Sequence, residues 1–181
     1  MESNYKKFVV ASIVTILLSL LLGGSGLFFG STATANDNII PAEGFFYAIP
    51  TIFPFTYTPV GNNCLVEVTG YLQFFGTLSG IAPGTTRALV FAPCELVVDS
   101  APGDYADVFM SKLEYEGTVT VDGETVTTAN ITYQGRTAEG GDIIAKMILS
   151  NGLKGVLKVE ARVVETGYYN GFINVKGSDG E

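Results

Sequence analysis

The sequence predicts an all-β domain, an antiparallel meander barrel of about eight strands, preceded by an N-terminal signal peptide. Three observations predict this fold. Apolar and polar residues alternate with a period of two in almost every segment between Cys64 and Val175, without a 3.6-residue amphipathic period. The turns between segments are too short for crossovers, so neighbouring strands must pair antiparallel. The strands are long, and closure into a barrel is what removes the edges of their sheet.

The first 35 of the 181 residues are typical of an export signal. Lys6 and Lys7 precede the apolar run Phe8–Leu22, and Ala33-Thr34-Ala35 predicts cleavage after Ala35. The alternative is an uncleaved anchor that contacts the membrane through Phe8–Leu22, although a glycine-rich stretch interrupts that run before spanning length is reached. Either way the sequence predicts a secreted or extracytoplasmic domain, which in the alternative is membrane-anchored at its N-terminus and faces outside.

Residues 36–63 form a proline- and aromatic-rich segment ahead of the regular strands. Four prolines interrupt six aromatic residues there, and proline is excluded from the centre of a sheet. Two interpretations remain open for this segment. It is either a lid or plug packed over a barrel mouth, or an edge strand followed by a linker.

Cys64 and Cys94 are the only two cysteines of the chain. In an oxidising compartment they predict one disulfide, which would stabilise the fold by roughly 3–4 kcal/mol through loop closure. The functional alternative is a reactive thiol, but the chain has no histidine to activate one.

The barrel domain is predicted over residues 64–176, with a flexible tail at 177–181. In chain order the sequence predicts strands at Gly44–Ile49, Cys64–Leu78, Thr86–Pro93, Leu96–Ser100, Tyr105–Val121, Glu124–Thr137, Ile143–Leu149, Leu153–Val163 and Tyr168–Val175. Turns are expected at Asp122-Gly123, Glu139-Gly140-Gly141, Asn151-Gly152 and Thr166-Gly167.

An aromatic residue precedes a glycine by two positions in four of these strands. The pairs are Phe74 and Gly76, Tyr115 and Gly117, Tyr133 and Gly135, and Tyr169 and Gly171. Glycines inside strands mark sharp bends, and nearby aromatic rings cover them where small barrels turn their corners. The spacing therefore favours a barrel, with ordinary variation in a glycine-rich chain as the alternative.

Composition excludes several classes of function. Histidine is absent, which removes Ser-His-Asp and Cys-His catalysis and histidine-containing zinc sites. The chain has 10 basic and 18 acidic residues. Without Glu2, Lys6 and Lys7 the mature chain has 8 and 17, a net charge of −9, which is the wrong sign for binding nucleic acid. No cofactor-binding motif occurs, so no cofactor is predicted.

Asp99, Asp104 and Asp107 form the densest acidic cluster and could offer oxygen ligands to calcium. Their spacing fits no standard calcium loop, so a solvated acidic turn is favoured and no metal site is predicted.

The period-two alternation places four polar residues on the same strand faces as the inward apolar residues: Asp107, Ser111, Tyr115 and Tyr133. If the barrel is hollow, these side chains would be the polar groups that its pocket offers to a ligand. A carboxyl group buried there could have a raised pKa and act as a general acid or base. The residues alone favour a plainer interpretation, in which Asp107 belongs to the turn before the strand and Ser111 is a small packed side chain.

Several stretches between Cys64 and Val175 resemble the allene oxide cyclase-like and dirigent-like β-barrel superfamily, and in particular its branch of secreted bacterial proteins. They are FGTLSG at 75–80, YEGTV at 115–119, ITYQG at 131–135, NGLKGVL at 151–157 and GYYNG at 167–171. The resemblance implies an eight-stranded barrel with an apolar cavity, often oligomeric, that acts on or holds hydrophobic small molecules. A homo-oligomer is accordingly left open. The cyclase's catalytic residues match no position in this chain, so none is assigned.

The leading functional hypothesis is a secreted barrel that binds a small hydrophobic molecule in its interior. One alternative is a cofactor-independent cyclase or isomerase of the allene oxide cyclase type, acting on a lipid-like substrate. The lack of a recognisable catalytic set favours binding over catalysis. Another is a structural or cell-surface domain without a ligand. The last is a membrane barrel with its apolar face outward, which the charged C-terminal tail disfavours.

Overall fold

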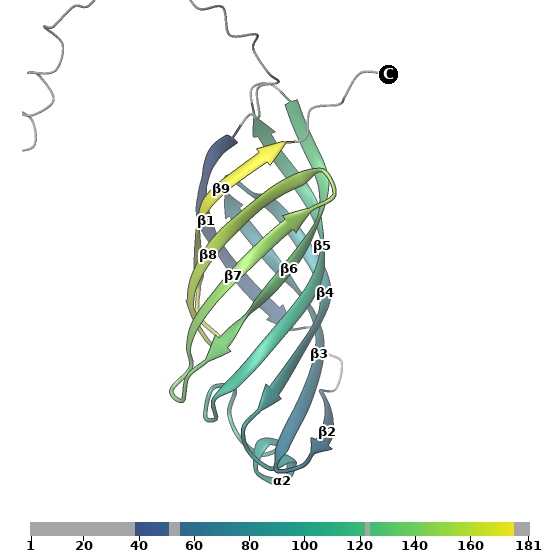
Figure 1. Ribbon diagram of the computed structural model, residues 1–181, viewed down its shortest axis with the longest axis vertical. Coiled ribbons are helices and arrows are strands. Elements are labelled where there is room, and N and C mark those ends of the chain that lie inside the picture. Colours follow the sequence, from purple (N-terminus) through teal and green to yellow (C-terminus); the bar gives the residue numbers. More distant parts are fainter. Residues whose placement is uncertain (1–38, 51–54, 122–123, 176–181) are drawn as a thin grey trace, which may run out of the picture. The chain divides into compact units, whose positions relative to one another are not determined.

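The computed structural model describes residues 39–50, 55–121 and 124–175, and within them it confirms the predicted antiparallel barrel (Figure 1). Its strands are β1 (Ile39–Pro50), β2 (Thr56–Val60), β3 (Asn63–Gly76), β4 (Ser79–Val90), β5 (Asp107–Val121), β6 (Glu124–Thr137), β7 (Asp142–Ser150), β8 (Leu153–Arg162) and β9 (Gly167–Val175). The closed barrel consists of β1 and β3–β9, and β2 extends its wall. The predicted signal peptide, the tail at 177–181 and the turn at Asp122-Gly123 lie outside the described residues.

Strand β1 closes the barrel, because it pairs with β9 over residues 39–46 and with β3 over residues 44–50. Residues 39–50 of the proline- and aromatic-rich segment are therefore a strand of the barrel wall and neither a lid nor a linker. Pro41 pairs only with β9 and Pro50 only with β3, so each proline lies where β1 has one neighbouring strand. This placement explains why a proline-containing segment can complete the sheet.

The chain between β4 and β5 is fastened to β3 by a disulfide. Cys64 on β3 is bonded to Cys94, with their Cα atoms 4.8 Å apart, as predicted. Cys94 begins a one-turn helix, α2 (Cys94–Val97), where the sequence predicted a strand at Leu96–Ser100. That prediction was wrong. Cys94 and Val97 are buried against Val90 and Ala92, which is a side-chain spacing that a helical turn satisfies.

The predicted alternation of inward and outward residues is confirmed along the strands. Buried residues such as Phe74, Leu113, Ile131, Met147 and Leu157 form one core inside the barrel. The lysines and glutamates of the same strands are exposed or only partly buried on the outer face.

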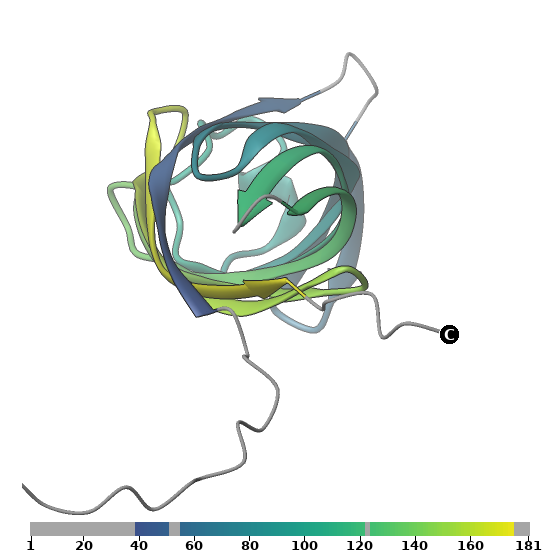
Figure 2. The same ribbon diagram turned by 90° about the horizontal axis from the view of Figure 1, so that it is seen from above.

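One end of the barrel is covered by the hairpin of β5 and β6, which curls across the opening when the barrel is seen along its length (Figure 2). The register of this pair shifts between Glu116 and Val119, and such a bulge bends the strands. As a result Val119 is buried and Val126 packs against the core.

Aromatic rings cover glycines, but not always the glycines predicted from spacing. A Cβ atom on Gly117 would overlap the ring of Tyr115, as the spacing predicted. The ring of Tyr169 instead lies over Gly44 on the neighbouring strand, so this pair is set by register and not by sequence distance.

We expect the double variant Cys64→Ala/Cys94→Ala to lose about 3 kcal/mol of unfolding free energy, because the disulfide closes a loop between residues 30 positions apart. Urea unfolding followed by circular dichroism measures this loss. The wild-type protein unfolded under reducing conditions is the control and should match the variant. A variant with the wild-type urea midpoint would show that the bond adds nothing to stability.

Candidate functional site

The end of the barrel that holds α2 contains a cavity of about 440 Å³. Inward-facing residues of β3, β4, β5 and β6 form most of its wall, and residues of β1, β2, β7 and β8 contribute to it as well. Residues of two loops, at 97–105 and 163–165, line its outer end. The interior is therefore divided into a filled half under the β5–β6 hairpin and a hollow half near α2.

The cavity exists because several inward-facing residues of this half are small and leave space beside larger ones such as Phe109 and Tyr133. Gly70, Gly84, Ala88, Ser111 and Ala161 occupy positions of the wall where other strand segments carry larger side chains. The filled half is packed with bulky residues, among them Phe74, Tyr115, Leu153, Tyr169 and Ile173, each at most 2% exposed. The change from large to small inward residues along the same strands leaves the space open.

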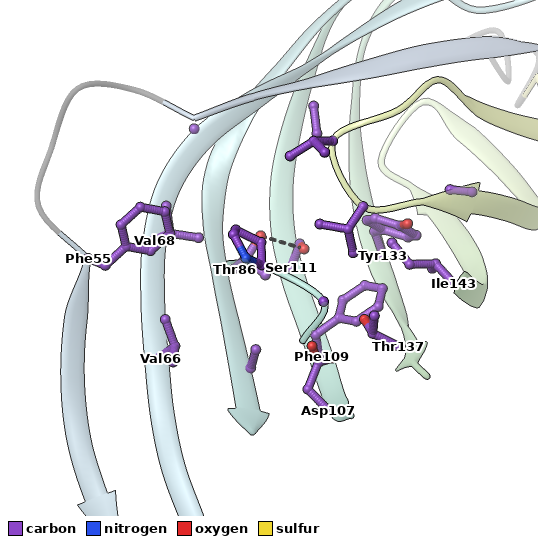
Figure 3. A pocket seen from close by; sticks show the side chains of 18 of the residues that line it. Phe55, Val66, Val68, Thr86, Asp107, Phe109, Ser111, Tyr133, Thr137 and Ile143 are labelled. Carbon is purple, nitrogen blue, oxygen red and sulfur yellow. Dashed lines mark hydrogen bonds between the residues drawn. The ribbon is translucent and has the colours of Figure 1, made fainter. Parts of the chain in front are cut away.

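Three of the four predicted site residues line this cavity. Asp107 and Ser111 come from β5 and Tyr133 from β6 (Figure 3). Two polar residues that the sequence analysis did not select, Thr86 and Thr137, lie there as well. The hydroxyl oxygens of Thr86 and Ser111 are 2.7 Å apart and hydrogen-bonded. The inward parity of Thr86 with Ala88 and Val90 was the signal that could have identified it.

Tyr115, the fourth predicted residue, is not part of the cavity. It is 1% exposed in the filled half, where its hydroxyl accepts a hydrogen bond from the Ser79 N–H at 3.0 Å and donates to backbone oxygens of Ser79 and Thr118. Tyr169 binds the adjacent backbone in the same way, since its hydroxyl accepts from the Leu78 N–H at 2.9 Å. Both tyrosines therefore satisfy the turn between β3 and β4 and have a structural role.

The ionisable groups of the cavity have pKa values shifted by burial. Desolvation raises the pKa of the Asp107 carboxyl, and the neighbouring hydroxyl and backbone N–H of Thr137 offset part of that rise. Burial, together with the negative charge of Asp107, raises the pKa of Tyr133 further above its usual range. The Tyr133 hydroxyl therefore stays protonated at neutral pH and can donate a hydrogen bond to a ligand.

The acidic residues between β4 and β5 do not gather into a metal site. Asp104 accepts a hydrogen bond from the Ala101 N–H at 2.8 Å, Asp99 is exposed, and Asp107 points into the cavity wall. Within residues 39–50, 55–121 and 124–175, no three carboxylate or cysteine side chains lie close enough together to hold a metal ion.

Comparisons with protein-family models, with curated proteins and with solved structures find no match to this chain. The resemblance to allene oxide cyclase-like barrels stays an expectation from the sequence. No helix among the described residues is long and apolar enough to cross a membrane.

We expect Tyr115→Phe to lower the unfolding free energy by about 1 kcal/mol, because it removes the partly buried hydrogen bonds between the Tyr115 hydroxyl and the backbone of Ser79. Tyr133→Phe is the matched control, since the Tyr133 hydroxyl makes no hydrogen bond to a described residue. Urea unfolding of both variants tests the assignment. Equal losses for the two would contradict the structural role of Tyr115.

The raised pKa of Asp107 predicts how stability depends on pH. Ionisation of this carboxyl is less favourable in the folded protein than in the unfolded chain. Its contribution to the free energy of unfolding is therefore fully present below the pKa of the unfolded chain and is lost as pH rises through the pKa of the folded protein. Asp107→Asn should therefore be more stable than the wild type at pH 7, and the advantage should vanish toward pH 3.

Melting temperatures of both proteins across this pH range provide the measurement. Asp99→Asn is the control and should follow the wild type, because Asp99 is exposed. An Asp107→Asn variant that tracks the wild type at every pH would show that the Asp107 carboxylate is not penalised by burial.

Proposed function

We propose that this protein is a secreted binding protein that holds a small hydrophobic molecule in the hollow half of its barrel. The observation that carries the proposal is the cavity itself. Its volume of about 440 Å³ lies within the usual range for small-molecule sites, and its wall is mostly apolar with a few converging polar side chains. A structural domain without a ligand would be expected to fill its interior in both halves.

Two features support the secreted location. The leader predicted over residues 1–35 would export the chain, and the bond between Cys64 and Cys94 is of the kind that forms and persists outside the cytoplasm.

A second candidate function is a cofactor-independent cyclase or isomerase. It is favoured by one observation, the pairing of a carboxyl group of raised pKa with a protonated tyrosine hydroxyl in the same cavity. Such a pair could move a proton on a substrate folded against the apolar wall. Turnover of an added lipid epoxide that is lost in Asp107→Asn would favour this function over simple binding.

Native mass spectrometry of protein purified gently from its own host tests the binding function directly. A molecule retained in stoichiometric amount, and identified after extraction, would support it. Protein that carries no molecule, and that also fails to take up an environment-sensitive apolar dye, would contradict it.

Filling the cavity should abolish binding. We expect Ala88→Phe to weaken the binding of an apolar dye by about tenfold or more, because the new ring would occupy space inside the wall. Thr85→Phe is the matched control, since Thr85 lies on the outer side of the same strand, opposite Lys112.

Dye fluorescence titration measures the two affinities, and melting temperatures confirm that both variants are folded, because an overpacked residue can destabilise a core. Equal affinity in Ala88→Phe and the wild type would place the bound dye outside this cavity.

A further inference from the structure

We propose that the molecule held in the cavity is a lipophilic amine, bound as its ammonium ion beside Asp107 with its apolar part against the cavity wall. This inference rests on the proposed binding function and names the chemical class of the ligand. It follows from the charges of the cavity, the unsatisfied carboxylate and the aromatic rings near it.

Among the described residues, three charged side chains line the cavity: Asp107, Arg162 and Glu165. Arg162 is already engaged at the rim. Its Nε atom lies 3.8 Å from Glu165 and 3.9 Å from Asp142, and its Nη2 donates a hydrogen bond to the Gly140 oxygen at 3.1 Å. Asp107 is thus the one charged residue of this wall that makes no ion pair with a described residue.

One oxygen of the partly buried Asp107 carboxylate lacks a hydrogen-bond donor. Its Oδ1 atom is shielded from solvent and has no hydrogen-bond partner among the described residues. Thr137, its register partner on β6, is the neighbour that favours the charged form. An ammonium group would bring both a positive charge and up to three N–H donors, which are what this carboxylate lacks.

Aromatic rings line the same cavity. The side chains of Phe109 and Tyr133 lie near Asp107 (Figure 3), and the centroids of their rings are 4.9 Å apart in an edge-to-face arrangement. The ring centroid of Phe46 lies 5.9 Å from that of Tyr133. Ring faces attract an organic cation, and a carboxylate with aromatic neighbours is a common setting for amine recognition. The chain's net charge of −8 would add a long-range attraction for cations.

The same features disfavour other amphiphiles. The carboxylate of a fatty acid would be repelled by Asp107, and Arg162 is engaged by two acidic residues at the rim. An alcohol could donate one hydrogen bond to Asp107 but would gain no charge attraction. For ligands that share the same apolar chain, we therefore expect the amine to bind most tightly, the alcohol less tightly and the acid most weakly.

The experiment is calorimetric titration of the full exported protein with decylamine, decanol and decanoate, each kept below the concentration at which it aggregates. These probes share one apolar chain and differ in the head group. We expect decylamine to bind at least about tenfold more tightly than decanol, and decanoate to bind most weakly.

The variant Asp107→Asn should lose about tenfold or more of its affinity for decylamine, while its affinity for decanol changes little. Asp99→Asn, an exposed acidic residue outside the cavity wall, is the control and should bind decylamine as the wild type does. This control separates a specific pair from the general attraction of a negatively charged protein.

The outcomes distinguish the two proposals. Equal binding of the three probes, unchanged in Asp107→Asn, would overturn the amine assignment and leave the apolar binding function standing. Tighter binding of decanoate would overturn it in the same way. No binding of any probe, in a protein that also excludes the apolar dye, would overturn both.

Discussion

The interior of this protein depends on one contact, the pairing of β1 with both β9 and β3. Without it the strands β3–β9 would form an open sheet with two unsatisfied edges. The paired residues can be followed from strand to strand around the barrel, starting at Leu65 on β3. The path passes through β4–β9 and β1 and returns to β3 at Phe75, so one circuit shifts the register by ten residues. This stagger tilts the strands and sets the width of the space that side chains must fill.

The sizes of the inward-facing side chains then determine which part of that space is packed and which part stays open. Aromatic and branched residues fill the half under the β5–β6 hairpin, where the hydroxyls of Tyr115 and Tyr169 also satisfy the backbone of the β3–β4 turn. In the other half, inward-facing glycine, alanine, serine and threonine residues leave space between larger side chains such as Phe109 and Tyr133. Burial in the wall of that half raises the pKa values of Asp107 and Tyr133. The packed core and the open cavity thus lie toward opposite ends of the same strands.

Most of the fold could be predicted from the sequence, because period-two alternation and short turns are local signals. Two features could not. The role of β1 depends on which neighbours flank Pro41 and Pro50, and that is a property of the closed barrel. The helix at Cys94–Val97 depends on the disulfide and on burial against β4. For the site, the alternation of residues correctly placed Asp107, Ser111 and Tyr133 on the inner face. Alternation does not show whether the interior at a given height of the barrel is packed or open, so it also predicted Tyr115.

The pairing of β1 with β9, which closes the barrel and is called the seam below, also affects the rate of folding. Its register joins Ile39 to Asn174, near the two ends of the described chain, whereas each hairpin from β3 to β9 joins strands that follow one another in sequence. Contacts between distant parts of a chain slow folding, because loop-closure entropy is lost before the contacts form. Truncation at either end strand would open the same seam. The first and last strands therefore behave as a single cooperative element despite lying at opposite ends of the sequence.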